Sequence, residues 1–372
     1  MPIKKKVDTP DRDELAQTIA DSLNSLMKND GQVAYFLDGN EDTPIDLDDW
    51  VSTGATMLDL AISNRPHGGL PVGRIVELTG LEQSGKSLLA AHAIASTQKA
   101  DGIGVMIDTE SSANEEFWRS IGLDMSKMVY AQADALEDVF DMVTEIIEKV
   151  RKSHKDKLVT IVVDSIAAAS TKKEIEADFG KDGYATDKAI ILSKAMRKIT
   201  GMIAKQRVLL IFTNQLRQKM NAMPFADPYT TSGGKAIGFH ASVRLRLATK
   251  SKIKNSNGDV IGVTVKATVQ KNRCGPPHRV AEFDIYFDRG IDDYASWLKV
   301  MKENKLIKQA GAWYTFTDGK GEEHKFQSKE FPEFLEEDVE RKEMIYEDIC
   351  EKVIMSYRST DKEPIFEETS EE

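Results

Sequence analysis

The sequence has few cysteines: Cys274 and Cys350 are the only two among 372 residues. This excludes a small secreted scaffold held by disulfides and suits a reducing compartment such as the cytoplasm. The sequence also lacks any apolar run close to the 18 residues that indicate a membrane-spanning helix, so we expect no membrane association. Its basic start, MPIKKKVDTPDRDE, has no apolar core segment and does not resemble a secretory signal.

Acidic residues outnumber basic ones, and the formal net charge is −11. Such a charge by itself argues against a polyanionic partner. The basic residues are concentrated, however: residues 188–254 hold fourteen Lys and Arg and one acid, Asp227. The C-terminal stretch DKEPIFEETSEE has the opposite bias. This segregation favours a localised surface for a polyanion, with a solvated basic face as the alternative.

The first 50 residues are predicted to form an N-terminal helix and a linker. Residues 11–28 carry apolar side chains at helical spacing, and Thr9 and Pro10 supply an N-cap and a first helical residue. The polar, acidic stretch that follows to about residue 50 is typical of a linker. An amphipathic helix must bury its apolar stripe. It could do so on its own core or on a neighbouring subunit, and the periodicity does not separate the two.

Residues 51–290 are predicted to form an α/β core with a mostly parallel central sheet. Apolar runs at 74–79, 104–108, 159–164 and 208–214 alternate with helical patterns such as 134–151 and 187–205. Apolar strands separated by helices indicate a parallel sheet covered on both faces. After residue 240 the pattern changes to period two, which predicts antiparallel strands that extend this sheet; these segments are 242–248, 263–271 and 282–287.

The remaining residues are predicted to form a small C-terminal domain and a tail. Residues 291–357 combine a helix, a hairpin over 310–326 and a helical stretch over 333–357, which is an α+β pattern. Residues 358–372 are acidic and poor in apolar residues, so we expect them to be disordered.

The stretch TGLEQSGKSLL, residues 79–89, fits the pattern G-x-x-x-x-G-K-[ST] and lies between a predicted strand and a predicted helix. Glycines allow backbone N–H groups to line a concave nest, and the helix directs its positive dipole end toward it. The motif predicts that Lys86 reaches the β- and γ-phosphates of ATP and that Ser87 binds Mg²⁺. An ordinary glycine turn with a solvated lysine is the alternative. The predicted ATP-binding loop comprises Gly80, Glu82, Gln83, Ser84, Gly85, Lys86, Ser87 and Leu88.

Polar side chains follow the ends of the other predicted strands, where ligands bind to parallel sheets. Asp164 ends the run TIVVD and suits a second Mg²⁺ contact, although it could also cap a helix. Glu110 is the candidate carboxylate that polarises the attacking water. Asn214 and Gln215 end the next strand, and an amide there could contact the γ-phosphate.

Residues 216–238 form a long stretch rich in Gly, Pro and Met that lacks periodicity. A structureless segment of this size in a compact core indicates a functional loop. Arg217 and Lys219 could bind phosphates, and Phe225 with Met220 and Met223 could contact bases. The segment is therefore a candidate nucleic-acid contact.

Seven segments resemble the bacterial RecA recombinases in order and spacing, and the resemblance covers roughly residues 10–345. These are GGLPVGRIVELTGLEQSGKS, VVDSIAAASTKKEIE, SKAMRKI, IFTNQLR, TTSGGKAIGFHASVRL, VQKNR and AGAWY. The resemblance implies a RecA-like ATPase core with an N-terminal arm and a small C-terminal domain. It also implies an ATP-dependent helical filament on single-stranded DNA that pairs this strand with homologous duplex. A self-cleaving repressor and filament loaders are possible partners.

The resemblance also implies roles for individual residues. Gln215 would couple the γ-phosphate to the DNA loop, and Lys271 and Arg273 would reach the phosphates from a neighbouring subunit. Asn114 and Phe117, where the family commonly has Asp and Tyr, would flank adenine. The N-terminal helix would dock on the adjacent protomer. The DNA loops would be 178–187 and 217–232, with contacts from Ser193, Arg197, Ser232, Gly233, Gly234 and Lys235.

Two other functions remain open. A hexameric DNA-translocating helicase could use the same core, although the amphipathic arm and its linker favour the filament. A non-catalytic DNA-binding regulator with a decayed ATP site is a third possibility. The intact Lys86, Ser87, Glu110 and Asp164 argue against that last reading.

Overall fold

The computed structural model describes residues 12–27, 32–37, 43, 46–111, 113–154, 156–177, 184–219 and 227–356. Several predicted features lie outside these residues: Thr9 and Pro10, most of the first DNA loop, Met220, Met223 and Phe225, and the acidic tail. The chain divides into two compact units, before and after the boundary between Asp48 and Asp49.

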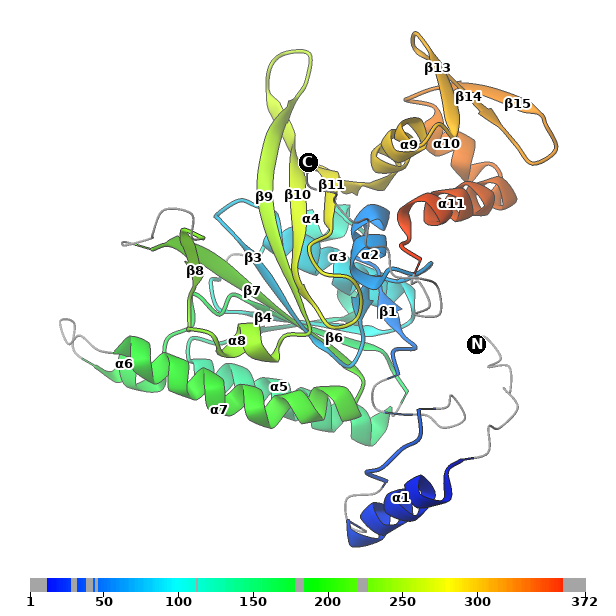
Figure 1. The fold of residues 1–372 in the computed structure, drawn as a ribbon. Coiled ribbons are helices and arrows are strands. Elements are labelled where there is room, and N and C mark those ends of the chain that lie inside the picture. The colour runs from blue at the N-terminus through cyan, green and yellow to red at the C-terminus, as the bar shows by residue number, and fades with distance from the viewer. Residues whose placement is uncertain are drawn as a thin grey trace, which may run out of the picture. The chain divides into compact units, whose positions relative to one another are not determined.

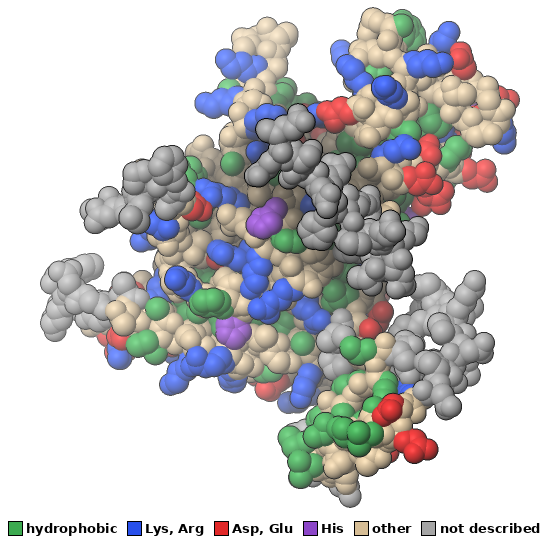
Figure 2. Space-filling model, in the orientation of Figure 1, with side chains coloured by type: hydrophobic (Ala, Val, Ile, Leu, Met, Phe, Trp, Pro, Cys, Tyr) green, Lys and Arg blue, Asp and Glu red, His purple; other side chains and the backbone are tan. Residues whose placement is uncertain are grey.

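The N-terminal unit contains helix α1, Glu14–Leu26. Its start differs from the prediction: Asp13, not Thr9, is the N-cap, and its Oδ1 accepts a hydrogen bond from the Ala16 N–H at 2.9 Å. A carboxylate at this position satisfies a free N–H and complements the helix dipole. No residue of α1 is buried, and Figure 2 shows its hydrophobic side chains gathered on one face. Their exposed fractions run from 42% to 77% over Leu15, Ile19, Leu23, Leu26 and Met27.

The second unit is built on a ten-stranded sheet (Figure 1). Its order is β12-β11-β10-β9-β3-β7-β6-β4-β5, and β8 pairs with β7 outside this path. The pairs from β9 to β5 are parallel. The apolar runs predicted β3, β4, β6 and β7 among them. Strand β5 was not predicted, and the expectation that 242–248 is antiparallel is wrong toward β3, because β9 runs parallel to β3 and antiparallel only to β10. These strands are β3 (Ile75–Gly80), β4 (Ile103–Asp108), β5 (Met128–Gln132), β6 (Val159–Asp164), β7 (Val208–Gln218) and β9 (Val243–Lys254).

The predicted antiparallel extension is also present. It consists of β10 (Val260–Asn272), β11 (Val280–Tyr286) and β12 (Gly290–Asp292), each antiparallel to its neighbour. The sheet therefore has a parallel centre and an antiparallel edge, which confirms the predicted α/β class.

Helices cover both faces of the parallel centre, which explains why its strands are apolar throughout. Along β7, Leu209 and Ile211 belong to one core, while Leu210 and Phe212 belong to the other. Helices α2 (Thr56–Ser63) and α3 (Lys86–Lys99) pack into the first core. Helices α5 (Leu136–Ser153) and α7 (Tyr184–Lys205) pack into the second and run along one side of the sheet in Figure 1.

Shorter elements complete this region. They are β1 (Trp50–Val51) paired with β2 (Leu70–Pro71), α4 (Glu115–Ser120), a 3₁₀ turn at Met125–Lys127, α6 (Lys172–Glu176), β8 (Tyr229–Thr231) and α8 (Ala236–His240). The segment 216–238 is thus more regular than predicted, because Leu216–Gln218 of β7 pair with β8 and α8 follows.

The C-terminal part contains α9 (Asp293–Glu303), a three-stranded antiparallel sheet, α10 (Phe331–Glu336) and α11 (Val339–Val353). The sheet is formed by β13 (Ile307–Ala310), β14 (Trp313–Thr317) and β15 (Glu323–Gln327), one strand more than the predicted hairpin. The predicted single helix over 333–357 is broken, since Asp338 caps α11 by accepting from the Arg341 N–H at 3.0 Å.

Nowhere in the described ranges does a helix combine the length and the apolar character that crossing a membrane requires. Both cysteines carry free thiols.

Candidate nucleotide-binding and active site

The glycine loop connects β3 to α3 in a conformation that requires glycine at two positions. Gly85, just before α3, has φ 89°, and a Cβ there would lie 2.9 Å from Ile285 Cδ1. A Cβ on Gly80 would lie 2.2 Å from Ser84 Oγ. Side chains at these positions would therefore force the loop away from the start of α3. The N–H groups of the first turn of α3 carry the positive end of the helix dipole, which favours an anion.

Lys86 turns its ammonium group back onto this loop. Its Nζ donates to the Leu81 carbonyl at 2.8 Å and the Gly80 carbonyl at 3.3 Å. Burial lowers the pKa of Lys86, while the carboxylates of Asp164, Glu110 and Glu82 act in the opposite direction. A phosphate that replaced these carbonyls would meet a partly desolvated cation, which binds anions more strongly than a solvated one.

A buried hydroxyl also lacks a partner in this loop. Ser84 is 3% exposed, and its Oγ makes no hydrogen bond to any residue that the structure describes. A buried polar atom without a partner costs free energy. An oxygen of a ligand bound in the loop could accept a hydrogen bond from Ser84 Oγ, so the loop fits an anionic ligand.

Two carboxylates meet at the ends of adjacent parallel strands, β4 and β6. Asp108 and Asp164 are register partners. The Thr213 hydroxyl donates to Asp164 Oδ1 at 2.5 Å, and the Ser87 side chain is hydrogen-bonded to the same carboxyl. Burial raises the Asp164 pKa, and Glu110 and Asp108 add to that effect. A cation would relieve this repulsion. The Ser87 hydroxyl and the Asp164 carboxylate are oxygen donors of the kind Mg²⁺ prefers, so they fit that ion.

Glu110 lies beside this pair, where the sequence placed the water-polarising carboxylate. Its N–H donates to Asp108 Oδ1 at 2.7 Å, and its Oε1 accepts from Ser165 Oγ at 2.5 Å. The backbone bond and the serine bond fix the carboxylate near the end of β6. The site thus groups Lys86, Ser87, Glu110 and Asp164.

Asn214 and Gln215 have different surroundings, although they are adjacent on β7. Gln215 Nε2 donates to Glu82 Oε1 of the glycine loop at 2.7 Å. Asn214 is fully buried and donates to Glu77 Oε1 at 3.0 Å and to the Ser232 carbonyl at 3.2 Å. The sequence left open which of the two amides contacts the γ-phosphate, and the buried Asn214 amide is engaged with Glu77 and Ser232. Gln215 is the amide that reaches the loop.

A pocket of about 780 Å³ opens in front of the glycine loop. One wall is the loop itself with Phe117. A second wall was missed by sequence reasoning, because it comes from β9 to β11 and the residue after β11, and no local motif marks it. That wall consists of Thr249, Lys252, Val263, Ile285 and Phe287. Phe117 also lines a smaller hollow of about 110 Å³ with Ser87, Asp164 and Asn114, whose Oδ1 accepts from the Phe117 N–H at 3.0 Å.

Comparison with known proteins identifies the family. The model of the RecA N-terminal domain matches residues 17–292. Protein RecA of Trichodesmium erythraeum is 40% identical over 266 residues, covering 72% of this chain and 70% of the relative. Protein RecA of Corynebacterium efficiens is 36% identical over 337 residues, covering 89% and 83%. The chain belongs to the RecA family.

In this RecA family member, Lys271 and Arg273 lie at the end of β10, over α8. Lys271 Nζ donates to the Gly238 and Phe239 carbonyls, both at 2.9 Å, and Arg273 Nη2 donates to the Phe239 carbonyl at 3.4 Å. Neither lines the pocket at the glycine loop of the same chain. The structure therefore does not bring these two cations together with Lys86 within one subunit.

Several predicted DNA contacts of this RecA chain lie around the same helix. Lys219, Gly234 and Lys235 line one pocket of about 580 Å³, together with Arg244 and with Lys271, which was predicted to bind nucleotide phosphates and not DNA. Figure 2 shows Lys and Arg side chains gathered on the face around α8.

The other residues predicted to contact DNA lie on α7, on β7 and in the segment after β8. Arg197 donates to Ser193 Oγ at 2.8 Å on α7, and the Ser232 carbonyl accepts from Asn214. Gly233 and Gly234 have φ of 77° and 74°. Arg217 lies on β7, which pairs with β8 at Thr230.

Proposed function

We propose that this RecA family member is a DNA-dependent ATPase that forms helical filaments on single-stranded DNA and pairs that strand with homologous duplex in recombination and repair. One observation carries the proposal. Strand β7 brings Gln215 within 2.7 Å of Glu82 in the glycine loop, and the same strand continues through Arg217 into the basic segment after residue 218. Nucleotide and polynucleotide would therefore act on one rigid element.

The chain's own residues supply the parts of a hydrolytic site. Lys86 exchanges the Gly80 and Leu81 carbonyls for phosphate oxygens, and Ser84 Oγ gains an acceptor. Ser87 and Asp164 would hold Mg²⁺, which when bound neutralises charge on the triphosphate. Glu110, fixed by Ser165, orients the attacking water and accepts its proton.

The site is completed by a second copy of the chain. Lys271 and Arg273 do not line the pocket at the glycine loop of their own subunit. Their cationic ends lie at the carbonyls of α8, and Arg273 makes only one long contact there, at 3.4 Å. We infer that they bind the γ-phosphate held by the neighbouring subunit, as arginine fingers do in trans. The exposed apolar face of α1 supports docking on the adjacent protomer, since an unpartnered stripe of this kind needs a surface to cover it.

Asn114 and Phe117 would flank adenine, and the second wall, with Phe287, would enclose the nucleotide. Family membership supports a cytoplasmic location, and a self-cleaving repressor and loaders as partners of the filament. The domain limits 1–50, 51–290, 291–357 and 358–372 stay predictions.

Electron microscopy tests the proposal. The full chain is mixed with single-stranded DNA and a slowly hydrolysed ATP analogue, with Mg²⁺, and a nucleotide-free sample is the control. Extended helical filaments that need both ligands are expected. Closed rings would instead identify a hexameric translocase, and the absence of any assembly would contradict both.

A further inference from the structure

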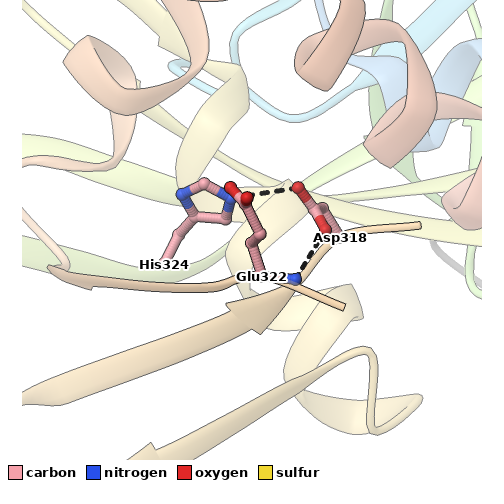
Figure 3. A group of neighbouring side chains, drawn as sticks. All are labelled: Asp318, Glu322 and His324. Carbon is pink, nitrogen blue, oxygen red and sulfur yellow. Dashed lines mark hydrogen bonds and ion pairs between the residues drawn. The ribbon is translucent and has the colours of Figure 1, made fainter. Parts of the chain in front are cut away.

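Three metal-binding side chains meet at the turn between β14 and β15 of the C-terminal sheet (Figure 3). They are Asp318, Glu322 and His324, and one donor atom from each lies within 4.8 Å of the other two. The proposed ATPase and DNA-binding functions use none of them. Both carboxylates and the imidazole belong to one short stretch of chain, so the group needs no second subunit.

The backbone of the turn orients Asp318. Its Oδ1 accepts from the N–H groups of Lys320 and Glu322, both at 2.9 Å. Its Oδ2 faces His324 Nε2 at 3.3 Å. The Asp318 side chain is 13% exposed, so it has little freedom to turn away. One oxygen thus holds the turn while the other faces the imidazole. Secondary hydrogen bonds of this kind orient the carboxylates of metal sites.

Aromatic packing orients His324 in the same way. Its ring stacks on Phe316, with centroids 6.4 Å apart, and lies 5.8 Å from Phe334 at a tilt of 55°. Phe316 is 2% exposed and anchors the ring to the core of the sheet. Packing against two apolar rings fixes the plane of the imidazole without engaging its nitrogens. Nε2 is therefore held toward the two carboxylates.

The contact between Asp318 and His324 has the spacing of two ligands on one tetrahedral ion. Zn²⁺ lies about 2.0–2.2 Å from nitrogen and carboxylate ligands, which places neighbouring ligands about 3.3–3.6 Å apart. The separation of 3.3 Å between Asp318 Oδ2 and His324 Nε2 matches this edge. Mg²⁺ prefers oxygen ligands in an octahedron, whereas imidazole suits Zn²⁺. An ion pair between Asp318 and a protonated His324 would explain their contact but gives no reason for Glu322 to share the site.

We propose that Asp318, Glu322 and His324 bind one Zn²⁺ ion, with water as the fourth ligand. The ion neutralises two carboxylates that would otherwise repel each other and fastens the tip of the β14–β15 hairpin. The site is independent of the glycine loop and of the proposed function.

Calorimetric titration of the full chain with ZnCl₂, with Mg²⁺ in large excess, tests the site. Three variants remove one ligand each: Asp318→Asn, Glu322→Gln and His324→Gln. Asp318→Asn keeps an oxygen that can accept the two turn hydrogen bonds, and Glu322 is exposed, so both variants should fold. His67→Gln is the matched control: His67 Nε2 also faces a carboxylate, Glu343 Oε1, at 3.2 Å, and within the described ranges no third metal-binding side chain joins this pair.

We expect the unmodified chain and His67→Gln to bind one more Zn²⁺ per chain than each ligand variant, or to bind it at least about tenfold more tightly. Unfolding temperatures without zinc should agree between the unmodified chain and Glu322→Gln. Zinc should raise this temperature in the unmodified chain and in His67→Gln but not in Glu322→Gln. If Glu322→Gln and His324→Gln bind zinc as the unmodified chain does, the proposal is overturned and the contact of His324 with Asp318 is an ion pair.

Discussion

Lys252 belongs to the candidate nucleotide site although no sequence motif includes this residue. It lies on β9 and, like Lys86, lines the pocket in front of the glycine loop. Thr249 connects the same strand to the loop, since its Oγ1 donates to the Gln83 carbonyl at 3.4 Å. A second cation in this pocket adds attraction for a triphosphate. Its place in the tertiary structure, and not its local sequence, makes it a candidate.

Replacing Lys252 by alanine should raise the KM for ATP about three- to tenfold, because about one charge-assisted contact is lost. Lys254→Ala is the control, since it removes a cation two residues along the same strand that does not line the pocket. Steady-state ATPase assays with DNA at saturation measure both. Equal KM values for the two variants would mean that Lys252 does not face the nucleotide.

Asp59 offers a test of a buried carboxyl. Burial raises its pKa from 3.8 to about 7, and Asp293 adds to this, although Ser52 and Thr53 donate hydrogen bonds that lower it. The folded chain therefore binds this proton more tightly than the unfolded chain does. The Asp59 contribution to the free energy of unfolding falls as pH rises from about 4 to about 7 and is constant above that range.

Asp59→Asn cannot ionise, so it should lose this part of the pH dependence. At pH 8 we expect the variant to be more stable than the unmodified chain by about 1–3 kcal/mol, and at pH 4 to be equal or slightly less stable. Unfolding temperatures at several pH values measure the difference. The same slope in both proteins between pH 5 and pH 7 would show that Asp59 is ionised in the folded chain.

At the scale of elements, two glycines near α7 should respond in opposite directions. Gly201 lies within α7, and a Cβ there would meet no atom within 4 Å. Gly201→Ala should stabilise the chain by about 0.5–1 kcal/mol, because alanine is the better helix former. Gly233 has φ 77°, and its Cβ would lie 2.3 Å from Leu192 Cδ1 of α7. Gly233→Ala should destabilise by about 1–3 kcal/mol.

Thermal unfolding of both alanine variants gives the comparison. Each variant adds one methyl group near the same helix. A change in the free energy of unfolding of opposite sign in the two variants would therefore come from the backbone conformation and packing at each position. A Gly233→Ala protein as stable as the unmodified chain would mean that the segment after β8 shifts to accommodate the added methyl group.

Elements with a local physical cause could be predicted from the sequence. Strands β3, β4, β6 and β7 were found because each carries a run of residues buried on both faces, and the glycine loop because Gly85 and Lys86 have a fixed spacing. Strand β5 was missed because it is a largely exposed edge strand. The break before α11 was missed, although Asp338 is a capping residue, because the helical pattern continues through it. The wall of Lys252 and Phe287 was missed because residues far apart in sequence build it.

At the scale of the whole molecule, the predicted catalytic residues do not all meet within one subunit. In the described chain, the glycine loop lies beside the acids Glu110 and Asp164, whereas Lys271 and Arg273 do not line the pocket at that loop. Head-to-tail association joins the two halves and generates an open filament when the rotation does not close. In such an assembly hydrolysis belongs to the contact between subunits. A single chain would carry two incomplete halves.

A mixing experiment decides whether this is so. Lys86→Ala lacks the loop cation and Arg273→Ala lacks the cation offered to the neighbour, so each alone should hydrolyse ATP at least about 100-fold more slowly on DNA. In an equal mixture, about a quarter of the contacts would join an intact loop to an intact Arg273, and turnover should return to about that fraction. The doubly substituted chain added to either variant should restore nothing. If no mixing ratio restores turnover while both variants still assemble on DNA, Arg273 does not act across the contact.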